Sequence, residues 1–130
     1  MESLVTTVTL PYPPSVNHYW RHVRVKSGHS FCNRVLISEE GRLYRQYILT
    51  MSYRLPKFKK QLIEVSIIAH PPDNRRRDID NLFKSVLDSL AHAGVYEDDS
   101  QIQRLTIRKE KPLSGGALIV SIKLFNNDEY

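Results

Sequence analysis

Cysteine is nearly absent from this sequence, since Cys32 is the only one among 130 residues. A single thiol cannot form a disulfide within the chain, and a reducing, intracellular setting is the simpler expectation. Long apolar runs are absent as well, because no segment approaches the roughly 20 apolar residues that a membrane helix needs. The start, Met1-Glu2-Ser3, carries no basic leader. We therefore expect a cytoplasmic protein with no membrane partner.

The chain also lacks internal repeats, low-complexity tracts and linker-like stretches. Its hydrophobic fraction of 41% and charged fraction of 25% are ordinary for a globular protein and too apolar for a disordered one. A length of 130 residues suits one domain with a core of its own. The sequence therefore predicts a single domain over residues 1–130.

Negative charge is in the minority. Nineteen Lys and Arg residues oppose fourteen Asp and Glu residues, which gives a net charge of +5 and a pI near 9.4. This balance favours polyanionic partners such as nucleic acids, although a basic composition alone does not identify one.

Apolar periodicity predicts four strands and two main helices. The strands are expected over residues 4–10, 63–70, 102–110 and 117–125, and the helices over residues 38–53 and 79–93. Ser38 is expected to cap the first helix, and Gly94 to end the second. The order β-α-β-α-β-β predicts an α/β (α+β) domain with one mixed sheet of about four strands.

Residues 15–34 show no sustained periodicity and are predicted to form a loop after the proline-rich stop at residues 11–14. The loop mixes aromatic and cationic side chains, which suits stacking on bases and pairing with phosphates. A surface loop whose Tyr19 and Trp20 pack on the core is an equally good interpretation. A zinc site is conceivable from the donors His18, His22, His29 and Cys32. Their spacing matches no tight ligand pattern, so we do not expect one.

The densest charge pattern lies at the start of the second helix, where Arg75, Arg76 and Arg77 are followed by Asp78 and Asp80. Either carboxylate alone has a structural explanation, because an N-cap Asp and first-turn acids both favour a helix. Three cations beside the positive end of a helix dipole are unfavourable by about several tenths of a kcal/mol. The arginine run therefore predicts an anionic partner.

Phosphodiester hydrolysis would use these groups together. Carboxylates are the hard oxygen ligands of Mg²⁺ or Mn²⁺, and arginines hold phosphates. The acidic run of residues 97–99 could add Asp99 as a ligand. The helix over residues 79–93 is about 22 Å long, and residues 95–99 extend to about 17 Å, so Asp99 can nearly return to Asp78 and Asp80. An ordinary acidic surface turn explains the run equally well.

Lys84 lies one helical turn after Asp80, and Asp88 continues the same stripe. A routine ion pair between Lys84 and Asp80 is one explanation. The other is catalytic, because a fixed ammonium beside the scissile phosphate would stabilise the negative charge that grows as water attacks. Next to the arginine run we expect the catalytic role.

Several motifs, in their order along the chain, resemble those of the RusA family of Holliday-junction resolving endonucleases. They are Pro13-Pro14-Ser15-Val16-Asn17 with Tyr19, Arg21 and His22; Ser38 through Arg45; Arg76 through Leu82 with Lys84; Ala93-Gly94; and Asp98-Asp99 with Gln101-Ile102. The chain departs from the family pattern at Val16, Trp20 and Glu97, which leaves the proposed metal ligands untouched.

The resemblance implies an enzyme that acts on four-way DNA junctions as a Mg²⁺-dependent homodimer, making paired symmetric nicks. It implies catalytic roles for Asp78, Asp80, Asp99 and Lys84, with the three carboxylates as metal ligands and Asp98 as a supporting acid.

Together these features predict a structure-selective endodeoxyribonuclease that uses Mg²⁺, with Mn²⁺ able to replace it. Its DNA contacts are expected from Arg75, Arg76, Arg77, Asn81, Arg21, His22 and Asn17. The alternative is a non-catalytic basic nucleic-acid-binding module of phage or prophage origin, in which Asp78 caps the helix and Asp80 pairs with Lys84. A third class, a structural subunit of a phage particle or replication complex, leaves the arginine run without a role.

Overall fold

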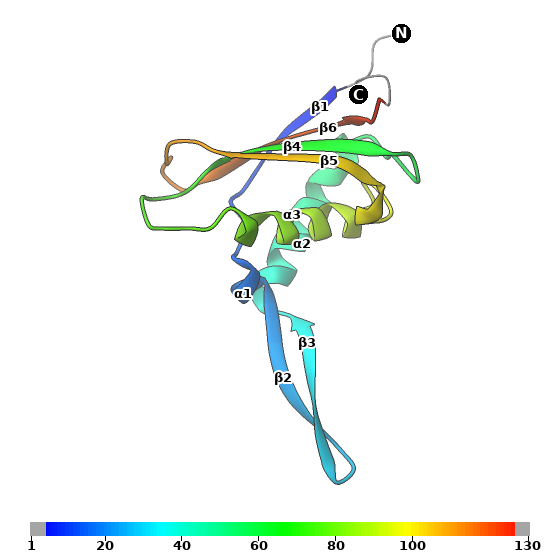
Figure 1. Ribbon diagram of the computed structural model, residues 1–130, viewed down its shortest axis with the longest axis vertical. Helices are drawn as coiled ribbons and strands as arrows, with labels where there is room; N and C mark the ends of the chain where they lie inside the picture. The colour runs from blue at the N-terminus through cyan, green and yellow to red at the C-terminus, as the bar shows by residue number, and fades with distance from the viewer. Residues whose placement is uncertain (1–4, 127–130) are drawn as a thin grey trace.

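The computed structural model describes residues 5–126, apart from the side chains of Val16 and Asn17. It contains a four-stranded sheet with helices on one face and a separate two-stranded hairpin (Figure 1). In chain order the elements are β1 (Val5–Leu10), α1 (Val16–Tyr19), β2 (Trp20–Ser27), β3 (Ser30–Ile37), α2 (Glu39–Met51), the 3-10 turn η1 (Ser52–Arg54), β4 (Ile63–His70), α3 (Asp80–His92), the 3-10 turn η2 (Asp99–Gln101), β5 (Ile102–Lys109) and β6 (Ala117–Leu124).

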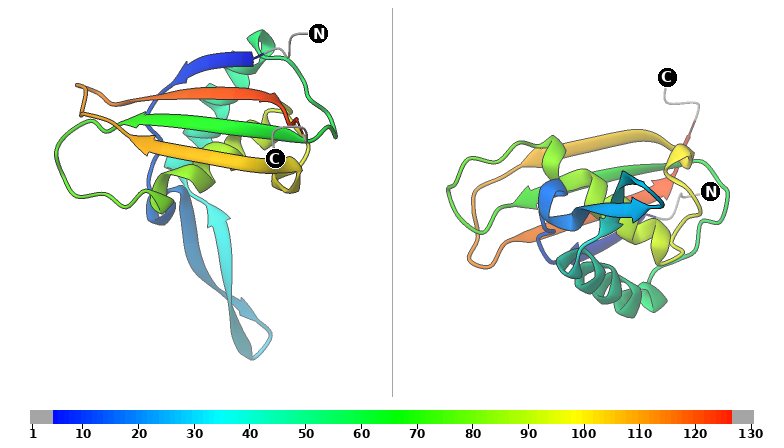
Figure 2. Two further views of the ribbon diagram at one scale, coloured as in Figure 1. Left: turned by 45° about the horizontal axis from the view of Figure 1, so that its top comes forward. Right: turned by 90° about the horizontal axis from the view of Figure 1, so that it is seen from below.

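The main sheet has the order β1-β6-β4-β5 (Figure 2). β4 and β5 are parallel and are joined through α3, whereas the pairs β1–β6 and β4–β6 are antiparallel. Alternate residues of β4, Ile63, Val65 and Ile67, are fully buried on the helix side. The opposite face is polar, because Lys123 pairs with Glu64 there at 2.8 Å. Only one face of the sheet therefore contributes to the core.

The two long helices complete the core with residues at helical spacing. Leu82, Val86 and Leu90 of α3 are each at most 3% exposed, and Tyr44 and Ile48 of α2 are also buried. Burying side chains of this size stabilises the fold by about 1.5–3 kcal/mol each. This packing fixes which stripe of α3 faces the sheet, and so which stripe faces solvent.

The predicted architecture is confirmed: the fold is a mixed α+β domain with the order β-α-β-α-β-β in its main elements. Ser38 caps α2 as predicted, because its Oγ accepts a hydrogen bond from Gly41 N at 2.9 Å. The helix ends at Met51, slightly before the predicted end, and η1 continues the turn. Leu4, the predicted first strand residue, lies outside the described residues. No helix within residues 5–126 is long and apolar enough to cross a bilayer.

The prediction of a loop over residues 15–34 was wrong. After the short helix α1, β2 and β3 pair along their whole lengths, from Trp20 opposite Ile37 to Ser27 opposite Ser30. Gly28, with a φ of 62°, begins the two-residue turn between them, as glycine does in type II′ hairpin turns. Both faces of this hairpin are largely exposed, so its strands lack the one-sided apolar alternation on which strand prediction depends.

The base of the hairpin is closed tightly against α2. Ser38 donates to the Tyr19 carbonyl from both its backbone N and its Oγ, each at 2.9 Å. A Cβ on Gly41 would lie 2.5 Å from the same carbonyl oxygen, so only glycine fits there. Tyr19 itself is fully buried, as expected if it packs on the core. The hairpin is therefore anchored to the body at its base.

Candidate active site

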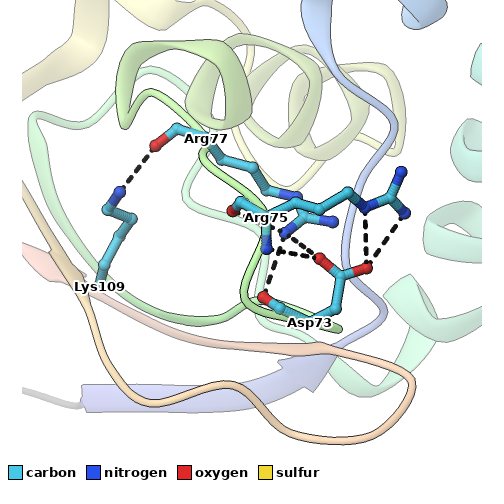
Figure 3. A network of polar contacts seen from close by, with 4 residues as sticks. All are labelled: Asp73, Arg75, Arg77 and Lys109. Atoms are coloured by element: carbon cyan, nitrogen blue, oxygen red, sulfur yellow. Dashed lines mark hydrogen bonds and ion pairs between the residues drawn. The ribbon is translucent and has the colours of Figure 1, made fainter.

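The loop of residues 71–79 carries the arginine run from the end of β4 to α3. Its start is held by Leu113 N, which donates to the Pro71 carbonyl at 2.9 Å. Its end is held by Lys109 Nζ, which donates to the Arg77 carbonyl at 2.7 Å (Figure 3). These contacts from β5 and the segment after it fix the position at which α3 begins.

Asp73 neutralises two of the three arginines (Figure 3). Its carboxylate accepts hydrogen bonds from Arg77 Nη1 at 2.7 Å and from Arg75 Nε and Nη2 at 3.1 and 3.0 Å. The hydrogen bond from Arg77 is the largest cause that holds the pKa of Asp73 well below its usual range. Asp73 thus balances part of the positive charge that the sequence alone leaves for an external anion. Arg76 is exposed and makes no ion pair within residues 5–126, so it is the arginine most available to a phosphate.

The alternative role of Asp78, capping α3 with its side chain, is not what the structure has. The cap position is Ile79, which has helical dihedrals and makes no side-chain cap hydrogen bond, and only the backbone carbonyl of Asp78 accepts, from Asn81 N at 3.2 Å. In the described part of the chain, the exposed carboxylates of Asp78 and Asp80 accept no hydrogen bond. Capping therefore does not account for Asp78.

A cleft of about 510 Å³ opens beside the solvent-facing stripe of α3. Its polar lining consists of Lys84 and Asp88 from α3 and Asp99 from η2, while Trp20 at the base of the hairpin and Phe83 form apolar walls. The chain does fold back after α3, and it brings Asp99 to Lys84. Asp78 and Asp80 do not line this cleft; Asp80 lies one helical turn before Lys84.

The surroundings of Asp99 disfavour its charged form. Asp99 stays exposed to solvent on one side, but partial desolvation in the cleft is the largest cause that raises the pKa of its carboxyl, and the neighbouring carboxylates of Asp98 and Asp88 raise it further. A cation beside Asp99 would relieve this repulsion. The cleft can therefore accept positive charge at its acidic end.

Asp88 is held in place by a network that the sequence did not reveal. Its Oδ2 accepts from Arg45 Nη2 at 2.6 Å and from Arg45 Nε at 2.9 Å, and it also accepts from the Tyr19 hydroxyl. Arg45 Nε donates to the Tyr19 hydroxyl as well, at 2.8 Å. The network joins α2, α3 and the hairpin base at one wall of the cleft. Its only signal in the sequence is the position of Asp88 four residues after Lys84.

Asp98 has a structural task. Its side chain accepts from Ser100 N at 2.9 Å, which lowers the pKa of the carboxyl and caps η2. The Gln101 side chain completes the capping box by accepting from Asp98 N at 2.8 Å, and it donates to the Lys59 carbonyl at 2.6 Å. Asp98 thus fixes the turn that presents Asp99.

The donor chemistry of this region fits a hard cation, although the donors do not form a closed cage. Within the described residues no group of three or more His, Cys, Asp or Glu side chains is placed to hold a metal ion. Mg²⁺ is commonly bound through one or two carboxylates, with waters and substrate phosphates as the remaining ligands. Asp78, Asp80 and Asp99 offer only carboxylate oxygens, which suit that mode of binding.

The remaining predicted contact residues lie on two elements. Arg21 and His22 are exposed on β2, and Asn81 is half-buried in the first turn of α3. The side chain of Asn17 lies outside the described part of the structure. None of these three described side chains lines the cleft.

Comparisons with known proteins identify the family of the chain. The sequence model of the family described as "Endodeoxyribonuclease RusA" matches residues 11–123. The chain is 39% identical over 115 residues to the "Crossover junction endodeoxyribonuclease rusA" of Enterobacteria phage HK97, which covers 87% of this chain and 89% of that protein. It is 36% identical over 124 residues to the protein of the same name from Shigella sonnei (strain Ss046), covering 94% of this chain and 97% of the relative. The chain therefore belongs to the RusA endodeoxyribonuclease family.

Proposed function

We propose that the protein is a metal-dependent, structure-selective endonuclease that resolves four-way DNA junctions by paired phosphodiester hydrolysis. The observation that carries this proposal is the shared cleft of Lys84 and Asp99, found in a chain whose curated relatives are named crossover junction endodeoxyribonucleases. A cation and a carboxylate in one cleft can act on the same phosphodiester.

Lys84 stabilises the transition state. As water adds to the scissile phosphate, negative charge grows on its oxygens, and an ammonium held on a rigid helix lowers the energy of that state. Lys84 is exposed at the mouth of the cleft, so a phosphate of the DNA backbone can approach it. Placement on α3 also limits its motion, because the opposite stripe of the helix is packed into the core.

Asp78, Asp80 and Asp99 are the residues that would hold Mg²⁺ or Mn²⁺, through their carboxylate oxygens. Bound there, the ion would lower the pKa of an attacking water and neutralise phosphate charge. Two features of the chain support these assignments: the carboxylates of Asp78 and Asp80 accept no hydrogen bond within residues 5–126, and Asp99 is held where positive charge is favourable. Asp98 supports the site by fixing η2.

DNA binding involves the groups around the cleft. Arg76 is free to contact a phosphate. Arg75 and Arg77 already pair with Asp73, so a phosphate would compete with that carboxylate for them. Asn81, Arg21, His22 and Asn17 provide further contacts on α3 and near the base of the hairpin. A four-way junction has two-fold symmetry, so cuts in two strands require two active sites related by a dimer axis.

The test compares cleavage of a labelled four-way junction with cleavage of a linear duplex of the same sequence, with Mg²⁺, with Mn²⁺ and with a chelator. The proposal predicts nicks in the junction only, and only when metal is present. If the junction is bound but never cut under any of these conditions, the protein is a non-catalytic binding module.

A single substitution can distinguish a metal ligand from a DNA contact, because loss of a ligand abolishes cleavage without abolishing DNA binding. Asp78→Asn keeps the size of the side chain and removes its charge, so we expect junction binding within about threefold of wild type and loss of cleavage. Glu40→Gln, an exposed acid in the first turn of α2, is the matched control and should retain both activities. Equal loss of binding and cleavage in Asp78→Asn would assign Asp78 a structural role instead.

A further inference from the structure

The hairpin of β2 and β3 projects from the body as a single narrow arm, which we call the ribbon arm (residues 20–37). Figure 1 shows it leaving the helical side of the domain below α1, and in the second view of Figure 2 it points toward the reader. Each strand has eight residues, which corresponds to about 26 Å at 3.3 Å per residue. Most of its residues are exposed. An arm of this kind contributes little to the core, so its sequence is free to serve an external contact.

The charge of the ribbon arm has one sign. Residues 20–37 contain four cationic side chains and no Asp or Glu; the cations are Arg21, Arg24, Lys26 and Arg34. The strand register places them on both faces, because Arg24 and Lys26 alternate with Arg21 along β2, and Arg34 lies opposite Val23 on the Arg21 face. Cations on both faces suit a partner that surrounds the ribbon with negative charge on two sides.

The major groove of duplex DNA is such a partner. It is about 12 Å wide and about 8.5 Å deep, it admits a two-stranded ribbon, and a phosphate backbone runs along each side. A ribbon that stands on edge in the groove has its two strands, about 4.8 Å apart, along the depth of about 8.5 Å, and its side chains point across the width. Its two cationic faces would then meet the two phosphate walls.

We propose that the ribbon arm inserts into the major groove of one duplex arm of the DNA substrate, with Arg24, Lys26 and Arg34 contacting its phosphates. This inference rests on the proposed function for the identity of the substrate. The base of the arm places it beside the chemistry, since Trp20 is the first residue of β2 and also a wall of the cleft with Lys84 and Asp99. One bound DNA molecule can therefore occupy the cleft and the arm together.

A second copy of the chain is the competing occupant, because Phe31 and Val35 are more than half exposed on the arm. Charge disfavours that choice, since a second copy brings the same net charge of +5 to a purely cationic arm. Phe31 is also already covered in part by Arg24, whose guanidinium carbon lies 4.2 Å from the ring centroid. The observations therefore favour the polyanion.

The experiment removes three charges from the arm of the full chain with Arg24→Gln, Lys26→Gln and Arg34→Gln together. The matched control removes three exposed charges from the body with Arg42→Gln, Lys60→Gln and Lys111→Gln. Binding of a linear duplex and of a four-way junction is measured by fluorescence anisotropy over a range of salt concentrations. We expect affinity about tenfold weaker for the arm variant at moderate salt, with a salt slope shallower by about 2 to 3. The control should remain close to wild type.

Dimethyl sulfate protection on the wild-type complex tests the groove directly, because the reagent methylates guanine N7 in the major groove and adenine N3 in the minor groove. Protection of guanine N7 along one arm of the junction, lost in the arm variant, is the expected result.

Protection confined to adenine N3, or unchanged affinity and salt slope in the arm variant, would overturn the proposal. So would a wild-type dimer that becomes monomeric in the arm variant, because the arm would then bind a second copy. If duplex binding depends on the arm while wild type cuts no junction, the arm assignment stands and the nuclease assignment fails.

Discussion

Lys84 of α3 and Asp99 of η2 line the same cleft, although the whole second half of α3 and a turn separate them along the chain. Apolar packing turns the Lys84 stripe of α3 away from the sheet, and the cap formed by Asp98 presents Asp99 toward it. Two independent local structures thus produce one site, and each can be perturbed without the other.

Replacing Lys84 tests its catalytic role. Lys84→Ala should lower the rate of junction cleavage at saturating protein by about 100-fold or more. The variant lacks the fixed ammonium that stabilises the negative charge growing on the phosphate in the transition state. Binding should change by only a few-fold. Single-turnover cleavage and anisotropy measure the two effects separately. Lys60→Ala, an exposed lysine outside the cleft, serves as the control, and equal cleavage by Lys84→Ala and Lys60→Ala would remove Lys84 from the mechanism.

Asp99→Asn should make the protein more stable and inactive. Burial raises the pKa of the Asp99 carboxyl in the folded state above that in the unfolded chain, about 3.9 for an ordinary Asp. The charged carboxylate therefore opposes folding once the pH rises through the folded pKa, and both states are protonated well below about pH 4. Thermal unfolding should show a higher Tm for Asp99→Asn at pH 7 and a shrinking difference toward pH 4.

Asp98→Ala should change the Tm at pH 7 in the opposite direction to Asp99→Asn. The hydrogen bond from Ser100 lowers the pKa of Asp98 in the folded state, so this carboxylate stabilises the protein above the unfolded pKa and loses its effect as the pH falls. The Tm of Asp98→Ala should be lower than wild type at pH 7, and the gap should narrow in acid. The same pH trend for both variants would contradict the distinct roles assigned to these neighbouring residues.

The Arg45–Asp88 pair should couple strongly in a double-mutant cycle. Arg45→Met and Asp88→Asn each leave a half-buried partner without its ion pair, which we expect to cost about 1–3 kcal/mol of unfolding free energy. The double variant should lose less than the sum of the two, with a coupling of about 0.5–3 kcal/mol. Urea unfolding of the four proteins measures it, and additive losses would show that the contact contributes nothing to stability.

Removing Asp73 should separate DNA affinity from catalysis. Asp73→Ala frees Arg75 and Arg77 for phosphates, so the salt dependence of junction binding should steepen by about 1 to 2. Cleavage at saturation should fall, because the loop leading to Asp78 loses the contacts that order it. Asp73→Glu is the matched control. Weaker binding with a shallower salt slope would contradict the neutralising role of Asp73.

Elements with one buried apolar face could be predicted from the sequence. The spacing of Leu82, Val86 and Leu90 defines α3, and the alternation of Ile63, Val65 and Ile67 defines β4, because burial acts on the same residues that the pattern displays. The length of the segment after α3 showed that Asp99 could return to the helix, while an ordinary acidic surface turn explained the segment equally well. The roles of Asp78, Asp80 and Asp99 as metal ligands stay predictions.

Polar contacts between distant segments could not be predicted in this way. Nothing in the local sequence pairs Arg45 with Asp88, since that contact depends on how α2 packs against α3. Asp73 was overlooked because its role lies in a loop, where hydrogen bonds follow no period. The ribbon arm has polar residues on both faces, so its strands resemble a loop, and Gly28 was the only local indication of its turn.

A supercoiled plasmid that extrudes a cruciform at an inverted repeat tests the central claim most directly. Two cuts made across the four-way junction within one binding event convert the plasmid to a linear product, whereas a single cut leaves a nicked circle. With Mg²⁺, the wild-type protein should yield linear plasmid whose ends map symmetrically to the cruciform base, and Lys84→Ala should yield little of either product. Only nicked circles, or intact supercoiled plasmid despite tight binding, would contradict the proposal that this protein resolves junctions by paired cleavage.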